Sequence, residues 1–244
     1  MYIKATNSTN SLMKEMLAKG EWPEGERFLY TGYQTAGRGQ TGNSWESEAD
    51  KNLLCSILLP PRQNLFELNV AVSVAVHKLI RSVLCQAKPV CALSGEAGLS
   101  IKWPNDIYFG DKKVAGILIE NAIIGNEIKY SIAGIGLNVN QTTFVSDAPN
   151  PVSLKQIRGQ EYDIERLMSL LFETVQSVLN ESEQEVWAYY KSHLYRREGF
   201  WPFEDKNGRF EAAIQNVLPT GEIVLSDQEG TPHQYHFKQV RYVI

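Results

Sequence analysis

Apolar residues recur at helical spacing in four segments of the chain. Segment 10–18 has the period of a short amphipathic helix, and segment 65–85 is too apolar and too long for a surface strand, which predicts a largely buried helix. Helical spacing returns at 164–179 and 183–194. We therefore expect four helices, the first of them capped by one of the polar residues Ser8, Thr9 and Asn10.

Runs rich in β-branched and aromatic residues predict six strands between the first and the third of these helices. They lie at 28–33, 52–59, 100–103, 107–109, 114–120 and 128–139. Tight turns at Gly110-Asp111 and Gly125-Asn126 separate the last three, which favours an antiparallel meander over a parallel sheet. The polar segment 141–150 is expected to be a loop that can order over a ligand.

After Arg197 the pattern changes to short strands broken by turn residues, at Asn207-Gly208, Pro219-Thr220-Gly221 and Glu229-Gly230. About 45 residues of this kind are typical of a five-stranded barrel. We therefore predict an α+β domain over 1–196, with a mixed or antiparallel sheet packed with helices, and a small C-terminal β-barrel domain over 197–244.

Composition and charge exclude several classes of function. The 244 residues carry a net charge of -4 and the isoelectric point is near 5.7, which argues against sequence-independent binding of nucleic acid. No apolar run approaches the ~20 residues of a membrane span, and the first residues do not form a secretory signal. We expect a cytoplasmic protein with neither nucleic acid nor membrane as a partner.

Cysteine and histidine spacing disfavours disulfide, zinc and hydrolase chemistry. Cys55, Cys85 and Cys91 stand singly, so we expect buried, reduced thiols rather than a disulfide framework or a zinc cage. The sequence contains no His-Glu-x-x-His and no Gly-x-Ser-x-Gly. A metalloprotease and a serine hydrolase are therefore disfavoured.

The run 37–42 matches the pattern Gly-x-Gly-x-x-Gly after a predicted strand. A dinucleotide-binding turn must open a helix, but the residues that follow lack an apolar helical stripe, and no Walker or protein-kinase motif occurs elsewhere. What remains is a flexible loop whose backbone N–H groups can approach an anion, with Arg38 able to add a bidentate contact. An ordinary surface loop is the alternative.

A second polar cluster lies at Lys102-Trp103-Pro104-Asn105-Asp106, with Lys113 seven residues further on. Proline after tryptophan favours an extended chain at Trp103, so that Asn105 and Asp106 project from a fixed corner. Asp106 can hold magnesium, accept a ligand N–H or take a proton from an amine, and Lys113 can neutralise a carboxylate or phosphate. Alternatively, Asp106 caps a turn and Lys113 is a solvated hairpin charge.

Taken together with Ser8-Thr9-Asn10, these motifs resemble those of the biotin–protein ligases, also called biotin–[acetyl-CoA-carboxylase] ligases. The shared motifs, in the family's order and spacing, are Gly37-Arg38-Gly39 followed by Trp45, Lys102-Trp103-Pro104-Asn105-Asp106, Lys113-x-Ala-Gly-Ile-Leu-Ile-Glu120 and Gly134-Ile-Gly-Leu-Asn138. The resemblance covers essentially the whole chain. It implies a class II synthetase-like catalytic domain and an SH3-like C-terminal barrel.

The resemblance also implies an activity. Members of the family join biotin to ATP, giving biotinyl-5′-adenylate and pyrophosphate, and then pass the biotinyl group to a lysine of a biotin carboxyl carrier protein. ATP and Mg²⁺ are the implied cofactors and biotin is the substrate, while a homodimer is left open. Ser8-Thr9-Asn10 stands near the start of the chain, so we expect the monofunctional form without an N-terminal DNA-binding domain.

Residue roles carried over from the family fall into three sets. The catalytic set is Arg38, Lys113 and Asp106, with Asp106 either binding metal or aligning the acceptor lysine. The biotin-binding set is Ser8, Thr9, Asn10, Gln34, Arg38, Gly39, Gln40, Ser56, Lys113 and Gly116. The set for ATP and the adenylate is Gly37, Arg38, Trp45, Asn105, Gly136 and Asn138. No metal ligand is assigned.

The sequence departs from the family pattern in the glycine loop, where Gln40 and Asn43 stand in place of frequent arginines. We expect the adenylate to escape faster here, or to depend more on Lys113. Two alternative functions remain. A lipoate or octanoate ligase or transferase needs an apolar tunnel rather than polar groups such as Gln34. A non-enzymatic binding or SH3-like interaction protein would leave Arg38 and Lys113 without a shared purpose.

Overall fold

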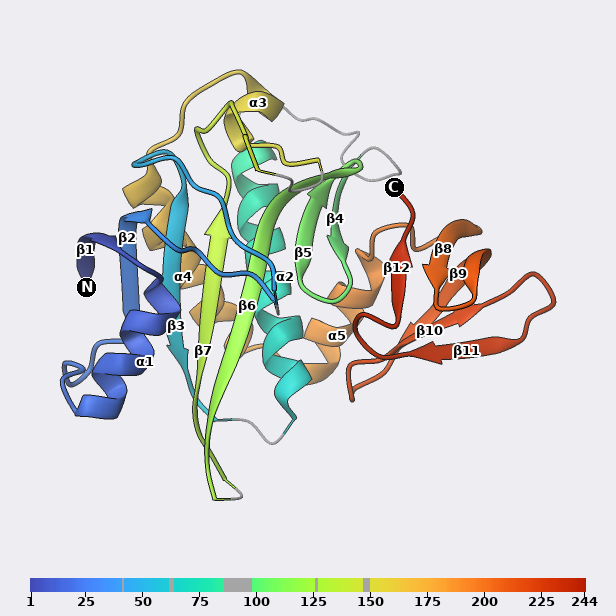
Figure 1. Ribbon diagram of the computed structural model, residues 1–244, viewed down its shortest axis with the longest axis horizontal. Coiled ribbons are helices and arrows are strands. Elements are labelled where there is room, and N and C mark those ends of the chain that lie inside the picture. Colours follow the sequence, from blue (N-terminus) through green and yellow to red (C-terminus); the bar gives the residue numbers. More distant parts are fainter. Residues whose placement is uncertain (41, 62–63, 86–97, 126, 147–149) are drawn as a thin grey trace.

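A seven-stranded sheet forms the centre of the protein (Figure 1). The structure is a computed structural model that describes residues 1–40, 42–61, 64–85, 98–125, 127–146 and 150–244. The strand order is β1-β2-β3-β7-β6-β5-β4. The strands are Tyr2–Thr6 (β1), Phe28–Gln34 (β2), Leu53–Leu59 (β3), Leu99–Lys102 (β4), Asp106–Phe109 (β5), Lys112–Ile124 (β6) and Glu127–Leu137 (β7). Among the described strands of this sheet, β1 pairs in parallel with β2 and the other pairs are antiparallel, so the sheet is mixed. The predicted meander of β4 to β7 is confirmed.

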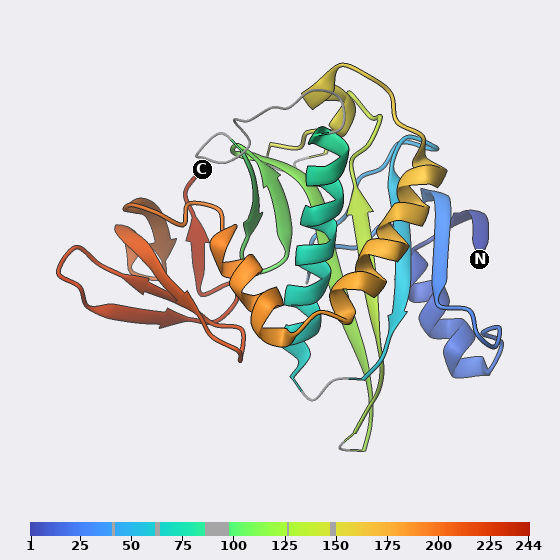
Figure 2. The ribbon, with the colours of Figure 1, turned by 180° about the vertical axis from the view of Figure 1, so that it is seen from behind.

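Helices cover both faces of this sheet. They are Thr9–Lys19 (α1), Leu65–Cys85 (α2), Leu154–Arg158 (α3), Ile164–Leu179 (α4) and Glu183–Ser192 (α5). Figure 2 shows α2, α4 and α5 together on one face, whereas α1 packs on the other face against β2, β3 and β7. The sheet is therefore buried on one face by three helices and on the other by α1 and loops.

Strand periodicity sorts the side chains of β3, β6 and β7 between the two faces. The register aligns Ile57, Ala133 and Ile119, which pack with α2 in the main hydrophobic cluster. Gly116 and Gly136 pair with each other at positions of opposite parity, so they face the other side of the sheet. One face is thus an apolar core and the other a surface with small residues in its middle.

Helix α2 is the central helix of the core, with the bounds predicted from the apolar spacing. By length and composition alone it would suffice to cross a membrane, which corrects our expectation that no apolar run approaches that length. In the folded chain, however, 72% of its most apolar 18-residue stretch is buried inside the protein. Its hydropathy is therefore explained by packing between the sheet, α4 and α5.

A second sheet of five antiparallel strands follows, in the order β11-β10-β9-β8-β12. The strands are Trp201–Asp205 (β8), Gly208–Val217 (β9), Ile223–Ser226 (β10), Pro232–Tyr235 (β11) and Val240–Tyr242 (β12). It lies at the end of the large sheet where β4 and β5 are found (Figure 1). The indole of Trp103 donates to the carbonyl of Gly221 at 3.0 Å, and Asn64 donates to the carbonyl of Pro219 at 2.9 Å. These bonds fasten the second sheet to the first.

The predicted α+β class and the five C-terminal strands are confirmed, while the division at residues 196 and 197 stays a prediction. Strand β1 and helix α3 were not expected. Cys55 is buried as predicted, but Cys85 is exposed because it ends α2 at the surface, and Cys91 lies outside the described residues. Asn126 and the end of the 141–150 loop, at 147–149, also lie outside them.

Candidate active site

A cavity of about 310 Å³ opens on the glycine-bearing face of the large sheet. It is bounded by the start of α1, the loop that carries Arg38, the strands β6 and β7, and the end of the chain. Thirteen of the residues predicted for the site line it, namely Ser8, Thr9, Asn10, Gln34, Arg38, Gly39, Gln40, Trp45, Asn105, Asp106, Lys113, Gly116 and Gly136. Residues from three distant parts of the sequence therefore share one cavity.

Glycines in the sheet leave room for the side chains that pack on the floor of the cavity. A Cβ atom on Gly136 would lie 2.4 Å from Cε2 of Trp45, and a Cβ atom on Gly134 would lie 2.6 Å from Oδ1 of Asn10. Neither distance is sterically allowed. Trp45 and Asn10 can rest directly on the sheet only because these two positions have no side chain.

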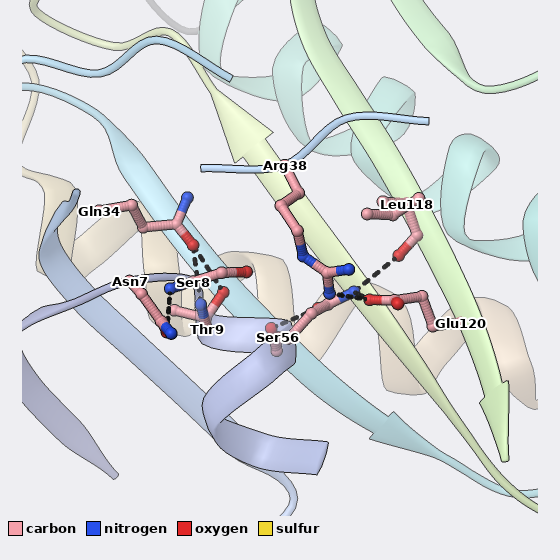
Figure 3. A network of polar contacts seen from close by, with 9 residues as sticks. Asn7, Ser8, Thr9, Gln34, Arg38, Ser56, Leu118 and Glu120 are labelled. Atoms are coloured by element: carbon pink, nitrogen blue, oxygen red, sulfur yellow. Dashed lines mark hydrogen bonds and ion pairs between the residues drawn. The ribbon is translucent and has the colours of Figure 1, made fainter. Parts of the chain in front are cut away.

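One end of the cavity carries a connected set of polar groups (Figure 3). The carboxylate of Glu120 accepts from Nδ2 of Asn10 at 2.9 Å and from the guanidinium of Arg38 at 2.5 Å. Nδ2 of Asn10 also donates to the carbonyl of Leu118, and its Oδ1 accepts from the hydroxyl of Ser56 at 2.6 Å. Because every polar atom of the Asn10 side chain has a partner, its orientation is fixed.

The neighbouring polar pair links α1 to β2. Oε1 of Gln34 accepts from the backbone N–H of Thr9 at 2.8 Å and from its hydroxyl at 3.2 Å. Ser8 occupies the N-cap position of α1, but its side chain makes no capping hydrogen bond, contrary to our expectation of a side-chain cap. Ser8 and Thr9 instead line the cavity. This end suits a small polar ring with donors and acceptors of its own.

The other end of the cavity carries opposite charges. Nζ of Lys113 lies 2.7 Å from Oδ1 of Asp106 and 5.6 Å from the centre of the Trp45 ring. The side-chain amide of Asn105 donates to the carbonyl of Ile117, and this bond fixes the corner after the cis Trp103-Pro104 peptide beside β6. The ion pair holds the ammonium group of Lys113 beside the ring of Trp45.

Three predicted residues do not line the cavity. Ser56 is fully buried behind Asn10. The side chain of Asn138 donates to the carbonyls of Lys113 and Val152, at 3.4 and 3.3 Å, and so supports the strand that carries the lysine. Gly37 lies against the backbone of Trp45, where a Cβ atom would come within 2.5 Å of its carbonyl oxygen. All three support cavity-lining residues from outside.

Glu46, which sequence reasoning missed, fastens the segment after Trp45 to the 141–150 loop. Its carboxylate accepts from the backbone N–H groups of Val145 and Ser146 at 2.9 and 2.8 Å, and from Nε2 of Gln141. Burial would raise the pKa of this carboxyl, but these hydrogen bonds outweigh it and hold the pKa below its usual value. The described part of the loop is therefore anchored beside the cavity.

The C-terminal sheet also contributes to the cavity, and this contribution was not predicted. The residues involved are Phe237, Lys238, Val240, Arg241 and Tyr242. From the second polar cluster, Lys102 and Trp103 line the cavity too, although neither was assigned a role. The Lys102 motif was a usable signal, whereas nothing local in 237–242 indicates a contact with the large sheet.

Acidic and sulfur ligands are too sparse for an all-protein metal cage. Within the described ranges, no group of three or more His, Cys, Asp or Glu residues could hold a metal ion. Asp106 and Glu120, the carboxylates beside Lys113 and Arg38, are engaged in ion pairs with these two cations. The arrangement can instead bind a molecule with a polar head at one end and hold anions through Arg38 and Lys113.

Known proteins share this fold and sequence pattern. The protein from Bacillus spizizenii called bifunctional ligase/repressor BirA is 27% identical over 249 residues, which is 96% of this chain and 71% of that protein. The biotin–[acetyl-CoA-carboxylase] ligase of Mycobacterium tuberculosis is 31% identical over 180 residues, or 72% of this chain and 62% of that protein.

Among solved structures, the biotin protein ligase from Aquifex aeolicus in complex with biotin and ATP is similar, with a TM-score of 0.77 and 24% identity. The similarity covers 100% of this chain and 98% of that one, and it establishes the common fold. The family model described as the biotin/lipoate A/B protein ligase family matches residues 2–138, more than half of the chain. The chain therefore belongs to the biotin/lipoate A/B protein ligase family.

Proposed function

We propose that this chain is an ATP-dependent biotin–protein ligase. The observation that carries the proposal is that one cavity holds a fixed polar end, at Asn10 and Gln34, together with the cations of Arg38 and Lys113. The polar end suits the ureido ring of biotin, which has N–H donors and a carbonyl acceptor. The cations suit a carboxylate and a phosphate that must approach each other.

In the first step, a carboxylate oxygen of biotin attacks the α-phosphorus of ATP. The new P–O bond gives biotinyl-5′-adenylate, and the bond from that phosphorus to the bridging oxygen breaks and releases pyrophosphate. Two anions repel each other on approach, so Arg38 and Lys113 lower the barrier by offsetting their charge. In the second step, a neutral lysine amine attacks the acyl carbon, loses a proton and displaces AMP.

Both cations begin the reaction in ion pairs, Arg38 with Glu120 and Lys113 with Asp106. When Lys113 turns toward the substrate, the carboxylate of Asp106 becomes available. It is then placed to align the incoming lysine and accept its proton. We assign this second role to Asp106 in preference to metal binding, because its observed partner is an ammonium group.

Magnesium fits this site as a companion of ATP. Mg²⁺ usually keeps several waters and is bound through substrate phosphates with few protein ligands, which agrees with the lack of a carboxylate cage among the described residues. When bound, the ion would neutralise phosphate charge. Arg38 and Lys113 would hold phosphate oxygens from the protein side.

The acceptor in this proposal is a biotin carboxyl carrier protein, and the protein acts in the cytoplasm. The names of the relatives, which include a biotin–[acetyl-CoA-carboxylase] ligase, support this partner. The polar lining around Gln34 and Thr9 favours biotin over lipoate, since a fatty chain would displace water from these polar side chains and offer them no hydrogen bond in return.

A pyrophosphate-release assay with ATP and either biotin or lipoate tests the proposal. We expect release with biotin, and a fall of at least tenfold in Arg38→Ala and Lys113→Ala, which corresponds to ~1.4 kcal/mol of lost transition-state stabilisation. Lys112→Ala, which removes the exposed neighbouring cation, is the matched control and should retain the rate. Pyrophosphate release with lipoate but not with biotin would contradict the proposed substrate. Full activity in both Arg38→Ala and Lys113→Ala would contradict the roles assigned to these residues.

A further inference from the structure

A second cavity, of about 400 Å³, lies outside the candidate active site. It is bounded by the second half of α2, the start of β4, the turn after β5 and the segment that connects α5 to β8. Helices α2 and α5 share one face of the large sheet (Figure 2). Among the described residues, the linings of the two cavities have no member in common. The second cavity is therefore a separate place for a ligand.

Arginine dominates the charge of this lining. Arg81 comes from α2, while Arg196 and Arg197 follow α5, and the lining carboxylates are those of Asp111 and Glu198. Asp111 lies 3.8 Å from Arg196. In the described part of the chain, no carboxylate forms an ion pair with Arg81 or Arg197. A chain with a net charge of -4 thus places an excess of cations around one cavity.

Arg81 is held by a neutral histidine instead of a carboxylate. Its guanidinium lies 3.1 Å from Nε2 of His193, and that nitrogen must accept because a guanidinium can only donate. Nδ1 of His193 then carries the proton and donates to the carbonyl of Tyr189 at 2.9 Å. The rings of His193 and Tyr189 stack with their centres 4.0 Å apart. These contacts orient the guanidinium but leave its charge unbalanced.

The pKa of His193 indicates the same excess of positive charge. Burial lowers this pKa most, and the charges of Arg81, Arg197 and Lys78 lower it further, while a backbone hydrogen bond opposes the shift. Every charged neighbour that shifts this pKa is therefore a cation. Lys78 already pairs with Glu181 at 2.7 Å, so Arg81 and Arg197 are the two that remain open to a ligand.

Arg196 is built into the wall of the cavity. Its side chain is 9% exposed, and its guanidinium lies 5.0 Å from the ring centre of Tyr195 and 4.8 Å from that of Trp201. Nη1 donates to the carbonyl of Val243 at 2.8 Å. Its backbone φ of 53° is in the left-handed region, where a non-glycine residue persists only if its surroundings hold it. The fold thus keeps a buried cation at a strained corner beside the cavity.

We propose that this second cavity binds a small oxyanion with two or more negative charges, a phosphate or a polycarboxylate, through Arg81 and Arg197. The buried charge of Arg196 adds to the attraction. The planar guanidinium groups match the oxygen pairs of both classes of anion. His193 is a positioning residue for Arg81. Such an anion would neutralise charge that the described carboxylates leave unbalanced.

Titration calorimetry with phosphate and with citrate tests the proposal, at an ionic strength held constant with chloride. We expect saturable binding to the wild type, and roughly tenfold weaker binding in Arg81→Gln and in Arg197→Gln. Arg81→Lys keeps the charge without the fork and should fall between the two. Arg166→Gln removes an exposed arginine of α4 outside the cavity, so this matched control should bind as the wild type does.

The same titrations in Arg38→Ala and Lys113→Ala separate the two cavities. We expect both variants to keep the wild-type affinity, whether or not the proposed ligase activity is found. Arg81 and Arg197 are exposed, so their variants should unfold at nearly the wild-type temperature in chloride alone. Tighter binding of one anion identifies the class of ligand. No saturable binding of either anion, or a loss in Arg38→Ala with none in Arg81→Gln, overturns the proposal.

Discussion

The two faces of the large sheet are built from alternate residues of the same strands, yet they obey different rules. On the face toward α2, Ile57 and Ile119 fill space among other apolar side chains. On the opposite face, Gly116 and Gly136 leave space, which Trp45 and a ligand cavity occupy. Alternate positions of one strand therefore need large apolar side chains on the core face and no side chain on the cavity face.

This difference predicts where a substitution costs stability and where it costs activity. A core side chain contributes through the apolar surface that it buries, so its removal leaves a cavity inside the fold. A glycine under Trp45 contributes to activity instead, because it lets the tryptophan ring lie on the sheet. Four predictions test this separation, in order of decreasing effect.

Gly136→Val should cause the largest loss of activity. The added Cβ atom would lie within 2.4 Å of Trp45, so the ring and its loop must leave the sheet and the cavity loses its aromatic wall. We expect adenylate formation to fall about 1000-fold, or ~4 kcal/mol, with little change in the free energy of unfolding. Pyrophosphate release and urea denaturation measure the two quantities, and a large loss of stability at full activity would refute the separation.

Ile57→Ala should give the opposite result. Ile57 is fully buried on the helix-facing side of β3, and such truncations cost about 2–5 kcal/mol. We expect a loss of about 3 kcal/mol in the free energy of unfolding, with kcat per folded molecule near that of the wild type. Ile57→Val, with an expected cost near 1 kcal/mol, is the graded control. A specific loss of kcat at unchanged stability would count against the comparison.

His77 tests how the helix-facing side tolerates a polar group. Its ring contacts the hydroxyl of Tyr189 and the carbonyl of Leu99, and burial lowers its pKa from 6.5 to about 3. Between the two pKa values, His77 is protonated in the unfolded chain but neutral in the folded protein. The free energy of unfolding should therefore fall as the pH is lowered through this range, by up to about 1.4 kcal/mol per pH unit.

Denaturation of His77→Gln at several pH values between 4 and 7 measures this contribution. The variant should lose that part of the pH dependence, whereas His233→Gln, at an exposed histidine, should retain it. The same slope in His77→Gln and in the wild type would show that the buried ring does not cause it.

Gln40→Arg should have the smallest effect, and it acts on the ligand-facing side. Gln40 lines the cavity where a cation would face the bound adenylate. An arginine there should slow adenylate release several-fold, which corresponds to roughly 1 kcal/mol. Gln40→Lys tests charge without the planar fork. Stopped-flow release of biotinyl-adenylate gives the rate, and an unchanged rate would remove Gln40 from the explanation.

Long periodic segments were predictable because their signal is local. The spacing of apolar residues predicted α2 and α4 with the bounds that the structure has. Strand β1 was missed because most of its residues are exposed and no apolar alternation marks it. Helix α3 is short, but Ser153 and Gln156 form a capping box that was present in the sequence and could have indicated it.

The site divides in the same way. Glycine loops and charged corners carry their chemistry in a few adjacent residues, so Arg38, Asp106 and Lys113 could be chosen from the sequence, and they line one cavity. Tyr242 reaches the cavity from the C-terminal sheet, and Glu46 binds backbone N–H groups far away in the chain. No local pattern encodes how a second sheet docks on the first, so these contributions became visible only in the fold.

The ion pairs within the cavity bear on turnover. With Arg38 held by Glu120 and Lys113 by Asp106, an incoming anion displaces an internal carboxylate instead of meeting a bare cation. The net gain on binding is therefore smaller than the charges alone would suggest. In the proposed reaction, each carboxylate can reclaim its cation when pyrophosphate or AMP departs. We therefore expect the groups that temper substrate capture to assist product release as well.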